Sequence, residues 1–331
     1  MKKQSILRLL FLIAPMLLCA ATARAQSVVA NLPESDAVVT INARRIVGET
    51  LPRLLSAEQM AGVQAALAKA KQVAGFDMAN VESAVIGLRL NRSKLMSAPS
   101  MLLVMRGSFN ADAIVSLMKI GLKDKLHDEK YGAKTLTLLK LTDLMPGGPA
   151  ASAVDVALVA LDGSTLMVGS SSYVKAALDA GSGKGRIKPE LVQLLAREPE
   201  SLVRLAALVP QGMLGNLIPK GGDGGEEIGR LAGSIEQIYL GLNMDAQGFP
   251  LTLVLKSNSA ENAHAIAGLL QTVAQMGMGS TDKNLKPIIE ALKVTSQETE
   301  VQIRTTLPQD LMASFVRGIL SPSKPAEQKK Q

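Results

Sequence analysis

Two stretches of the chain carry the same order of apolar and polar positions. Residues 81–90 (VESAVIGLRL) and 235–244 (IEQIYLGLNM) match in hydrophobic pattern, with a glutamate and a glycine in register. Short runs rich in Val, Ile and Leu are typical of β-strands. Each stretch therefore predicts a strand.

The elements around these two strands also match in order. A second apolar strand and then a helix follow each of them, and the triplet Pro-Glu-Ser precedes an earlier strand in both places. The matching segments are 33–46 and 199–209, 101–121 and 251–276, and 166–180 and 301–320. We therefore predict an internal duplication with the halves 26–190 and 191–320. The predicted fold class is α+β, in which each half is a largely antiparallel sheet packed with helices; whether the halves share one sheet stays open.

Helix signals support this assignment. Ser56 and Gln59 have the spacing of a capping box, and Asn110 is a favourable N-cap. Phe109 and Ile114 stand where a hydrophobic staple would lie around Asn110. The helix after Ser56 should bury one apolar face made of Met60, Val63, Leu67 and Val73 or Ala74.

Strand signals indicate how the sheets are built. Asp162-Gly163 lies between two apolar runs and predicts a hairpin, so neighbouring strands should be antiparallel there. Residues 101–105 and 156–161 are apolar at every position. Such runs favour strands that are covered on both faces or lie centrally in a thick core.

Several segments have the composition of connectors. They are rich in Gly, Pro and Ser and comprise residues 91–99, 145–152, 182–188 and 219–227. The segment 219–227 includes Gly221-Gly222-Asp223-Gly224-Gly225, and it predicts a flexible stretch where the first half has a helix. Residues 321–331 are rich in Pro, Lys and Gln and should be disordered.

The first 25 residues have the layout of a cleavable secretory signal. Lys2, Lys3 and Arg8 flank an apolar run, and Ala23-Arg24-Ala25 provides a small-residue cleavage pattern. The run is too short to cross a bilayer, and no later stretch offers about 18 uninterrupted apolar residues. We expect a periplasmic or secreted protein that begins near Gln26 and has no stable transmembrane anchor.

Removal of this signal changes the composition. Cys19, the single cysteine of the 331-residue chain, is lost, which excludes disulfides and cysteine metal sites from the mature chain. Lipid attachment at Cys19 is a lesser alternative, because Leu18 precedes it and the cleavage pattern lies further on. The signal holds four basic residues and no acid, so the net charge falls from +7 to +3. With no tryptophan and few other aromatic residues, the chain does not resemble a nucleic-acid-binding protein.

Candidate catalytic residues lack their partners. Ser172 and Lys175 have the Ser-x-x-Lys spacing of serine acylases, but the accompanying Lys-Thr-Gly and Ser-Asp-Asn motifs are missing. An N-cap role explains Ser172. The only histidines, His127 and His264, have no G-x-S-x-G elbow to serve, and both should lie at the surface. We therefore assign no catalytic residue.

Candidate ligand loops are equally incomplete. Gly181-Ser182-Gly183-Lys184-Gly185 departs from the phosphate-binding pattern at both of its ends and is interpreted as a linker. Carboxylates gather at Asp124, Asp128 and Glu129 and again at Asp223, Glu226 and Glu227. Neither group has the ligand spacing of a calcium loop, although the second is the better cation candidate. We assign no metal ligand, no cofactor-binding residue and no cofactor.

Three segments of the chain resemble segments of known bacterial proteins. The opening strand segment 32–45, the Gly75-Phe76-Asp77 step and the strand from Val81-Glu82 to Gly87-Leu88 resemble uncharacterised exported bacterial proteins of the domain-of-unknown-function type. These motifs are structural, and the resemblance implies no activity and no functional residue.

These observations predict a non-enzymatic extracytoplasmic protein that binds another macromolecule or acts as an envelope scaffold. A groove between duplicated halves is where binding is expected. Two alternatives stay open. One is a carrier of an apolar ligand, such as a lipid or a lipoprotein acyl chain, because Met, Leu and Val dominate the strands. The other is a hydrolase that uses Ser172 or a histidine.

Overall fold

The computed structural model describes residues 29, 32–74, 77–90, 99–122, 125–140, 155–181, 183, 185–219, 225–278 and 285–320. The predicted signal segment 1–25, the predicted tail 321–331 and most of the predicted connectors lie outside the described residues.

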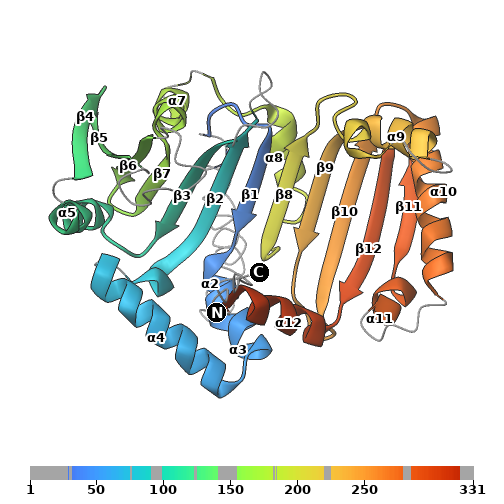
Figure 1. Cartoon of the computed structure of the whole chain (residues 1–331), viewed down its shortest axis with the longest axis horizontal. Coiled ribbons are helices and arrows are strands. Elements are labelled where there is room, and N and C mark those ends of the chain that lie inside the picture. The colour runs from blue at the N-terminus through green and yellow to red at the C-terminus, as the bar shows by residue number, and fades with distance from the viewer. Residues whose placement is uncertain are drawn as a thin grey trace, which may run out of the picture.

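Within the described residues, twelve strands form one continuous sheet, and every pairing in it is antiparallel. The strand order is β11-β12-β10-β9-β8-β1-β2-β3-β7-β6-β5-β4, and the sheet runs along the whole length of the molecule in Figure 1. The strands are β1 (Ala37–Ile41), β2 (Val81–Arg89), β3 (Ser100–Gly107), β4 (Leu126–Tyr131), β5 (Lys134–Lys140), β6 (Asp155–Asp162), β7 (Thr165–Ser170), β8 (Val203–Leu208), β9 (Ile235–Leu242), β10 (Phe249–Ser257), β11 (Lys293–Gln297) and β12 (Glu300–Leu307). The predicted α+β class with antiparallel strands is confirmed.

The junction at the centre of the sheet answers a question that the sequence left open. Strand β1 pairs with β8 through five opposed residues, from Ala37 opposite Ala207 to Ile41 opposite Val203. Strands β1 to β7 lie on one side of this junction, and β8 to β12 lie on the other. The segments before and after residue 190 therefore contribute to a single sheet.

Helices cover selected parts of this sheet. The longer ones are α4 (Ala57–Ala74), α5 (Ala111–Gly121), α7 (Ser171–Gly181), α9 (Gly225–Gly233), α10 (Ala260–Gly277) and α12 (Gln309–Leu320). Shorter segments are α2 (Ala43–Arg45), the π-helical η1 (Ile46–Thr50), α3 (Leu51–Leu54), the 3-10 turns η2 (Met78–Asn80) and η4 (Gly215–Leu217), α8 (Pro189–Leu195) and α11 (Leu285–Glu290). Figure 1 shows α5 and α4 toward one end of the sheet and α9, α10 and α11 toward the other.

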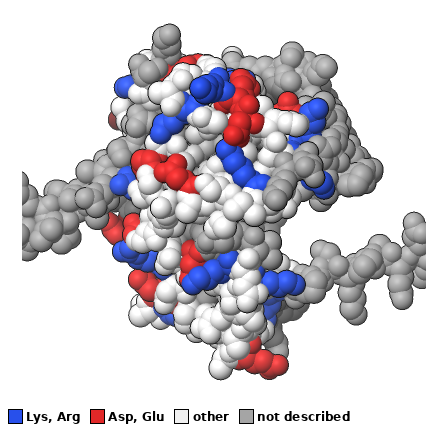
Figure 2. Space-filling model, turned by 90° about the vertical axis from the view of Figure 1, so that its left-hand side faces the viewer, with Lys and Arg blue, Asp and Glu red and all other residues white. Residues whose placement is uncertain are grey.

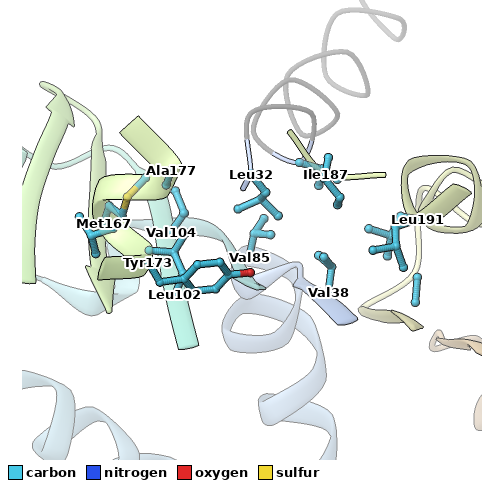
Figure 3. Packing of buried hydrophobic residues seen from close by; sticks show 14 of the residues in the cluster. Leu32, Val38, Val85, Leu102, Val104, Met167, Tyr173, Ala177, Ile187 and Leu191 are labelled. Carbon is cyan, nitrogen blue, oxygen red and sulfur yellow. The ribbon is translucent and has the colours of Figure 1, made fainter. Parts of the chain in front are cut away.

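One face of the sheet carries the largest hydrophobic core. Val38, Val85, Leu102 and Val104 point to this face and are almost fully buried, because α7 and α8 pack over them. Tyr173 of α7 lies flat among these residues, as Figure 3 shows. Burial of this many apolar side chains is the main stabilising contribution that the described residues reveal.

Helices on the opposite face stand apart from one another. Ile114 of α5 packs with Leu158 and Leu166 of β6 and β7 at one end. Ile266 of α10 packs with Val301 of β12 at the other end. A third cluster joins α3, α12 and Phe249 along one border of the sheet.

The predicted starts of two helices are confirmed. The Ser56 backbone N–H donates to Gln59 Oε1 at 3.0 Å, and the Gln59 N–H donates to Ser56 Oγ at 3.3 Å, which is the reciprocal capping box. Asn110 Oδ1 accepts from the Ala113 N–H at 3.0 Å, and Phe109 and Ile114 share one cluster. The sequence therefore fixes where α4 and α5 begin.

Two local predictions need correction. The strand predicted over residues 37–46 ends at Ile41, because Asn42 accepts a hydrogen bond from the Arg45 N–H and caps a helical segment. The flexible stretch predicted over residues 219–227 ends earlier, because α9 begins at Gly225. The predicted hairpin is present, with Asp162 paired to Thr165 across Gly163 and Ser164.

A substitution at Gly169 can test how closely β7 approaches β3. A Cβ atom at Gly169 would overlap the backbone of Met101 and Leu102, whereas one at Gly62 of α4 would meet nothing. We expect Gly169→Ala to lower the free energy of unfolding by about 1–3 kcal/mol through overpacking. Gly62→Ala, the control, should raise it by roughly 0.5–1 kcal/mol because alanine favours a helix interior. Denaturant unfolding of both variants checks this, and equal effects would contradict the packing of β7 on β3.

Candidate functional site

Along the middle of the six central strands, one face of the sheet carries apolar side chains. Three alternate positions on each of β3, β2, β1, β8, β9 and β10 point to the face opposite the main core. These eighteen residues are Met101, Leu103, Met105, Ala84, Ile86, Leu88, Ala37, Val39, Ile41, Val203, Leu205, Ala207, Ile238, Leu240, Leu242, Leu251, Leu253 and Leu255. We call this set the open sheet face.

Burial separates the two faces of these strands sharply. Met101 is 52% exposed, and the other seventeen side chains are partly buried. On the opposite face of the same strands, Val38, Leu102 and Ala206 have no exposed surface. Most of the open sheet face, including Val39 and Leu205, belongs to none of the core clusters formed by the described residues. A contiguous apolar surface of this kind is typical of an interaction site.

Helices border this surface. Met105 packs with α5 at one end, and Ile238 and Leu255 pack with α9 and α10 at the other. Val203 and Leu242 pack with α3 and α12 along one side. Among the described residues, the helices that pack on the open sheet face therefore lie along its borders.

This surface corrects one sequence prediction. The apolar run 101–105 was expected to be covered on both faces, but Met101 and Leu103 are not buried. The physical reason is the position of α5, which follows β3 in the chain yet packs over β6 and β7. The same expectation is confirmed for β6, where Leu158 is buried against α5 and Val159 lies in the main core.

Two buried tyrosine hydroxyls lie on the covered face, each over a glycine. The Tyr173 and Ser35 hydroxyls are 2.6 Å apart, and a Cβ at Gly87 would come within 3.4 Å of the tyrosine oxygen. Tyr239 donates to Glu198 Oε2 at 3.3 Å, and a Cβ at Gly241 would come within 2.7 Å of its oxygen. These contacts explain the two glycines that stand in register in the sequence.

The environment disfavours ionisation of every tyrosine in the chain. Burial raises the pKa of Tyr173, and burial together with the neighbouring Glu198 carboxylate raises the pKa of Tyr239. A hydrogen bond to Asp179 raises the pKa of Tyr131. These phenols therefore act as neutral hydrogen-bonding groups.

The structure does not assemble a catalytic set around Ser172. Ser172 lies exposed in the first turn of α7, and Lys175 forms an ion pair with Glu129 at 2.7 Å. The Lys175 ammonium is thus directed to β4. An N-cap role for Ser172 is also not observed, because the helix already begins at Ser171.

The two histidines lie far apart in the fold. His127 is exposed on the edge strand β4, and His264 is exposed on α10. His264 Nδ1 lies 3.3 Å from Ser296 Oγ, a contact that the sequence did not indicate. No described carboxylate forms an ion pair with either ring, so the pair lacks the third group that orients a catalytic histidine.

The predicted carboxylate groups behave as surface charge where they are described. Asp128 and Glu129 are neighbours on β4 and pair with different lysines, Lys119 and Lys175. The Lys119 ammonium holds the pKa of Asp128 below its usual range. Figure 2 shows both signs of charge intermingled over this end of the molecule.

Other predicted ligand residues lie partly outside the described part of the chain. Asp124, Asp223, Ser182 and Lys184 are among them, whereas Glu226 and Glu227 lie in the first turn of α9. Among the residues that the structure describes, no three potential metal ligands come together.

No helix in the described ranges is both long enough and apolar enough to span a membrane.

Comparison with solved structures identifies the architecture. Crystal form III of TP0453 has 14% sequence identity, covers 88% of this chain and 97% of its own, and superposes with a TM-score of 0.50. The fold resembles that of TP0453. Crystal form I matches with a TM-score of 0.48, 14% identity and the same coverage. No protein-family model and no curated protein sequence matches the chain. At this identity the likeness to TP0453 concerns the fold alone.

The raised tyrosine pKa values can be tested directly. The chain has three tyrosines and no tryptophan, so phenolate absorbance reports on Tyr131, Tyr173 and Tyr239 together. A free tyrosine is about half ionised at pH 10, and we expect a smaller phenolate fraction in the native protein at that pH. In concentrated guanidinium chloride all three should titrate normally.

The raised tyrosine pKa values also determine how the stability of the fold depends on pH. A folded-state pKa above the unfolded value gives stability that is complete below about pH 10 and is lost as the pH rises further. Native tyrosines that ionise near pH 10 without unfolding would contradict the buried positions of Tyr173 and Tyr239.

Proposed function

We propose that this chain is an exported, non-enzymatic binding protein that holds an apolar ligand, such as a lipid acyl chain, on the open sheet face. The observation that carries the proposal is the composition of that face. All eighteen side chains are apolar, and none is fully buried. Apolar surface left in contact with water has a cost of about 25 cal/mol for each Å², which a bound apolar ligand would remove.

The chemistry of this face favours an acyl chain over a macromolecule. Protein interfaces carry about one hydrogen bond for every 100–200 Å², but no side chain of the open sheet face can donate or accept one. The open sheet face is about 24 Å wide across its six strands, which are separated by five spacings. It is about 13 Å long between the first and last of the three alternate positions on each strand. That footprint of roughly 300 Å² is well below the 800 Å² that each partner contributes to a stable protein interface.

The relation between the two halves supports a site at their junction. We propose that residues 26–190 and 191–320 are duplicated units, as the sequence predicts. Pro33 and Pro199 lie 166 positions apart, and so do Val39 and Leu205, which pair at the centre of the β1–β8 ladder. A pseudo-twofold axis through this pair would exchange β1 with β8.

Strand registers agree with the offsets of the sequence match. The β1–β2 register places Ala37 opposite Leu88, and the corresponding residues of β8 and β9, Val203 and Leu242, are also opposed. The β2–β3 pair has a register shift between Val81 and Ser83. The matching β9–β10 pair has a register shift at the corresponding place, beside Ser257. A duplicated backbone accounts for both agreements.

Under this duplication, each half supplies nine residues of the open sheet face. Met101, Leu88 and Ile86 of the first half correspond to Leu251, Leu242 and Leu240 of the second. The apolar character is therefore kept on both sides of the axis although the residues differ. Retention at every position argues for a role that the two halves share.

Export and the absence of catalysis belong to the same proposal. The predicted secretory signal supports an extracytoplasmic location, where apolar ligands need a carrier to cross water. The separation of Ser172, Lys175 and the two histidines gives no support to the hydrolase alternative.

Leu205 is the residue with which to test this function, because it lies beside the axis and outside the core clusters. Leu205→Asp should weaken binding of cis-parinaric acid, a fluorescent fatty acid, at least tenfold, because a carboxylate would be desolvated against the chain. Fluorescence titration of the mature protein measures this. Thr295→Asp, at an exposed position of β11, is the control and should bind normally.

Native mass spectrometry of protein from its envelope fraction gives a second readout. A lipid-sized mass that is removed by organic extraction, and is absent from Leu205→Asp, is the expected result. A bare polypeptide that does not bind the fatty acid would overturn the carrier function. Protein crosslinked at the open sheet face instead would point to a macromolecular partner.

A further inference from the structure

A second recess lies in the C-terminal half, away from the open sheet face. Its volume is about 510 Å³, within the 300–1,000 Å³ range of small-molecule sites. The turn that contains η4, the helix α9 and the beginning of α10 form its walls. We call it the carboxamide pocket, because four of its lining side chains are Gln211, Asn216, Asn258 and Asn262.

Close backbone packing fixes two of the walls. A Cβ at Gly215 would overlap the Gly229 carbonyl oxygen, and one at Gly233 would lie 3.4 Å from Gly212 Cα. The Gly212 N–H also donates to the Gly233 carbonyl at 3.0 Å. The turn and α9 therefore meet backbone to backbone, which leaves little freedom for the pocket to collapse.

A chain of hydrogen bonds orients the polar groups of the pocket. Arg230 Nη1 donates to Asn262 Oδ1 at 2.9 Å, and Asn262 Nδ2 donates to Asn258 Oδ1 at 3.0 Å. Asn262 is held at its backbone by the cap residue Ser259, and the Asn258 N–H donates to the Ser234 carbonyl. The guanidinium is thus positioned by a neutral amide.

Arg230 is exposed and lies one helical turn after Glu226, which lines the same pocket. Among the described residues, no carboxylate forms an ion pair with Arg230. A guanidinium offers two parallel N–H groups that match a carboxylate. The nearby carboxamides each present one donor and one acceptor group, which is the pattern that a peptide unit requires.

We infer that the carboxamide pocket binds a short peptide through its C-terminal carboxylate. Arg230 receives the carboxylate, and Asn216, Asn258 and Asn262 bond the adjacent peptide units. Glu226 lines the same pocket and accepts from the ligand's N–H groups. None of the described lining residues is aromatic, so none of them could stack on a sugar ring. This inference is independent of the carrier function.

Tri-alanine with a free carboxylate is the probe, and its C-terminal amide is the matched ligand control. We expect tri-alanine to shift the side-chain amide NMR signals of Asn216, Asn258 and Asn262 in a saturable manner. The amide-capped peptide should bind about tenfold more weakly, because the charge-assisted bonds to Arg230 are lost. Arg230→Gln should cause a similar loss in the full-length mature protein.

Lys293→Gln removes the same charge from β11, outside the pocket, and should leave binding unchanged. Arg230→Lys keeps the charge but not the parallel N–H pair, so an intermediate affinity is expected. The backbone spectrum of each variant checks that the fold is intact. Absence of saturable shifts, or equal binding of both peptides, would overturn the inference. Loss of peptide binding without loss of fatty-acid binding would leave the carrier function standing.

Discussion

The β1–β8 ladder is the interaction on which the rest of the structure depends. Each half of the sheet has at most seven strands, and either half alone would expose the backbone groups of a hydrophobic edge strand. Pairing of residues 37–41 with residues 203–207 satisfies both edges at once. The same pairing brings two rows of apolar side chains together into one surface. Continuity of the sheet and of the candidate binding face therefore have a single physical origin.

The two faces of the sheet at this junction differ in how deeply their side chains are buried. On one side, α7 and α8 exclude water from Val38, Leu102 and Ala206. On the other side, α5 and α10 pack mainly over β6, β7, β11 and β12, and Val39 and Leu205 belong to no core cluster of the described residues. Stability could have been gained by covering both faces. A fold that leaves the apolar face open favours an occupant that comes from outside the core.

The two halves differ in the connection between their first two strands, beside which the carboxamide pocket lies in the second half. Between its first two strands the first half has the eighteen-residue helix α4, whereas the second half has η4 and the shorter α9. Glycines allow that turn and helix to touch at the backbone, and the carboxamide pocket lies beside the contact. The apolar face is thus common to both halves, while the pocket belongs to one. The resemblance to TP0453 extends over 88% of the chain and concerns the fold alone.

Local chemistry in the sequence determined the element types, several boundaries and the antiparallel class. The capping box at Ser56, the N-cap at Asn110 and the hairpin at Gly163 depend on residues within a few positions of each other, so they are readable from sequence. The apolar alternation that forms the open sheet face is present in the sequence too. What the sequence does not contain is the side on which each helix packs, because that depends on contacts between segments far apart in the chain. Only the tertiary structure therefore decided that β1 joins β8, that Met101 stays exposed and that Arg230 meets Asn262.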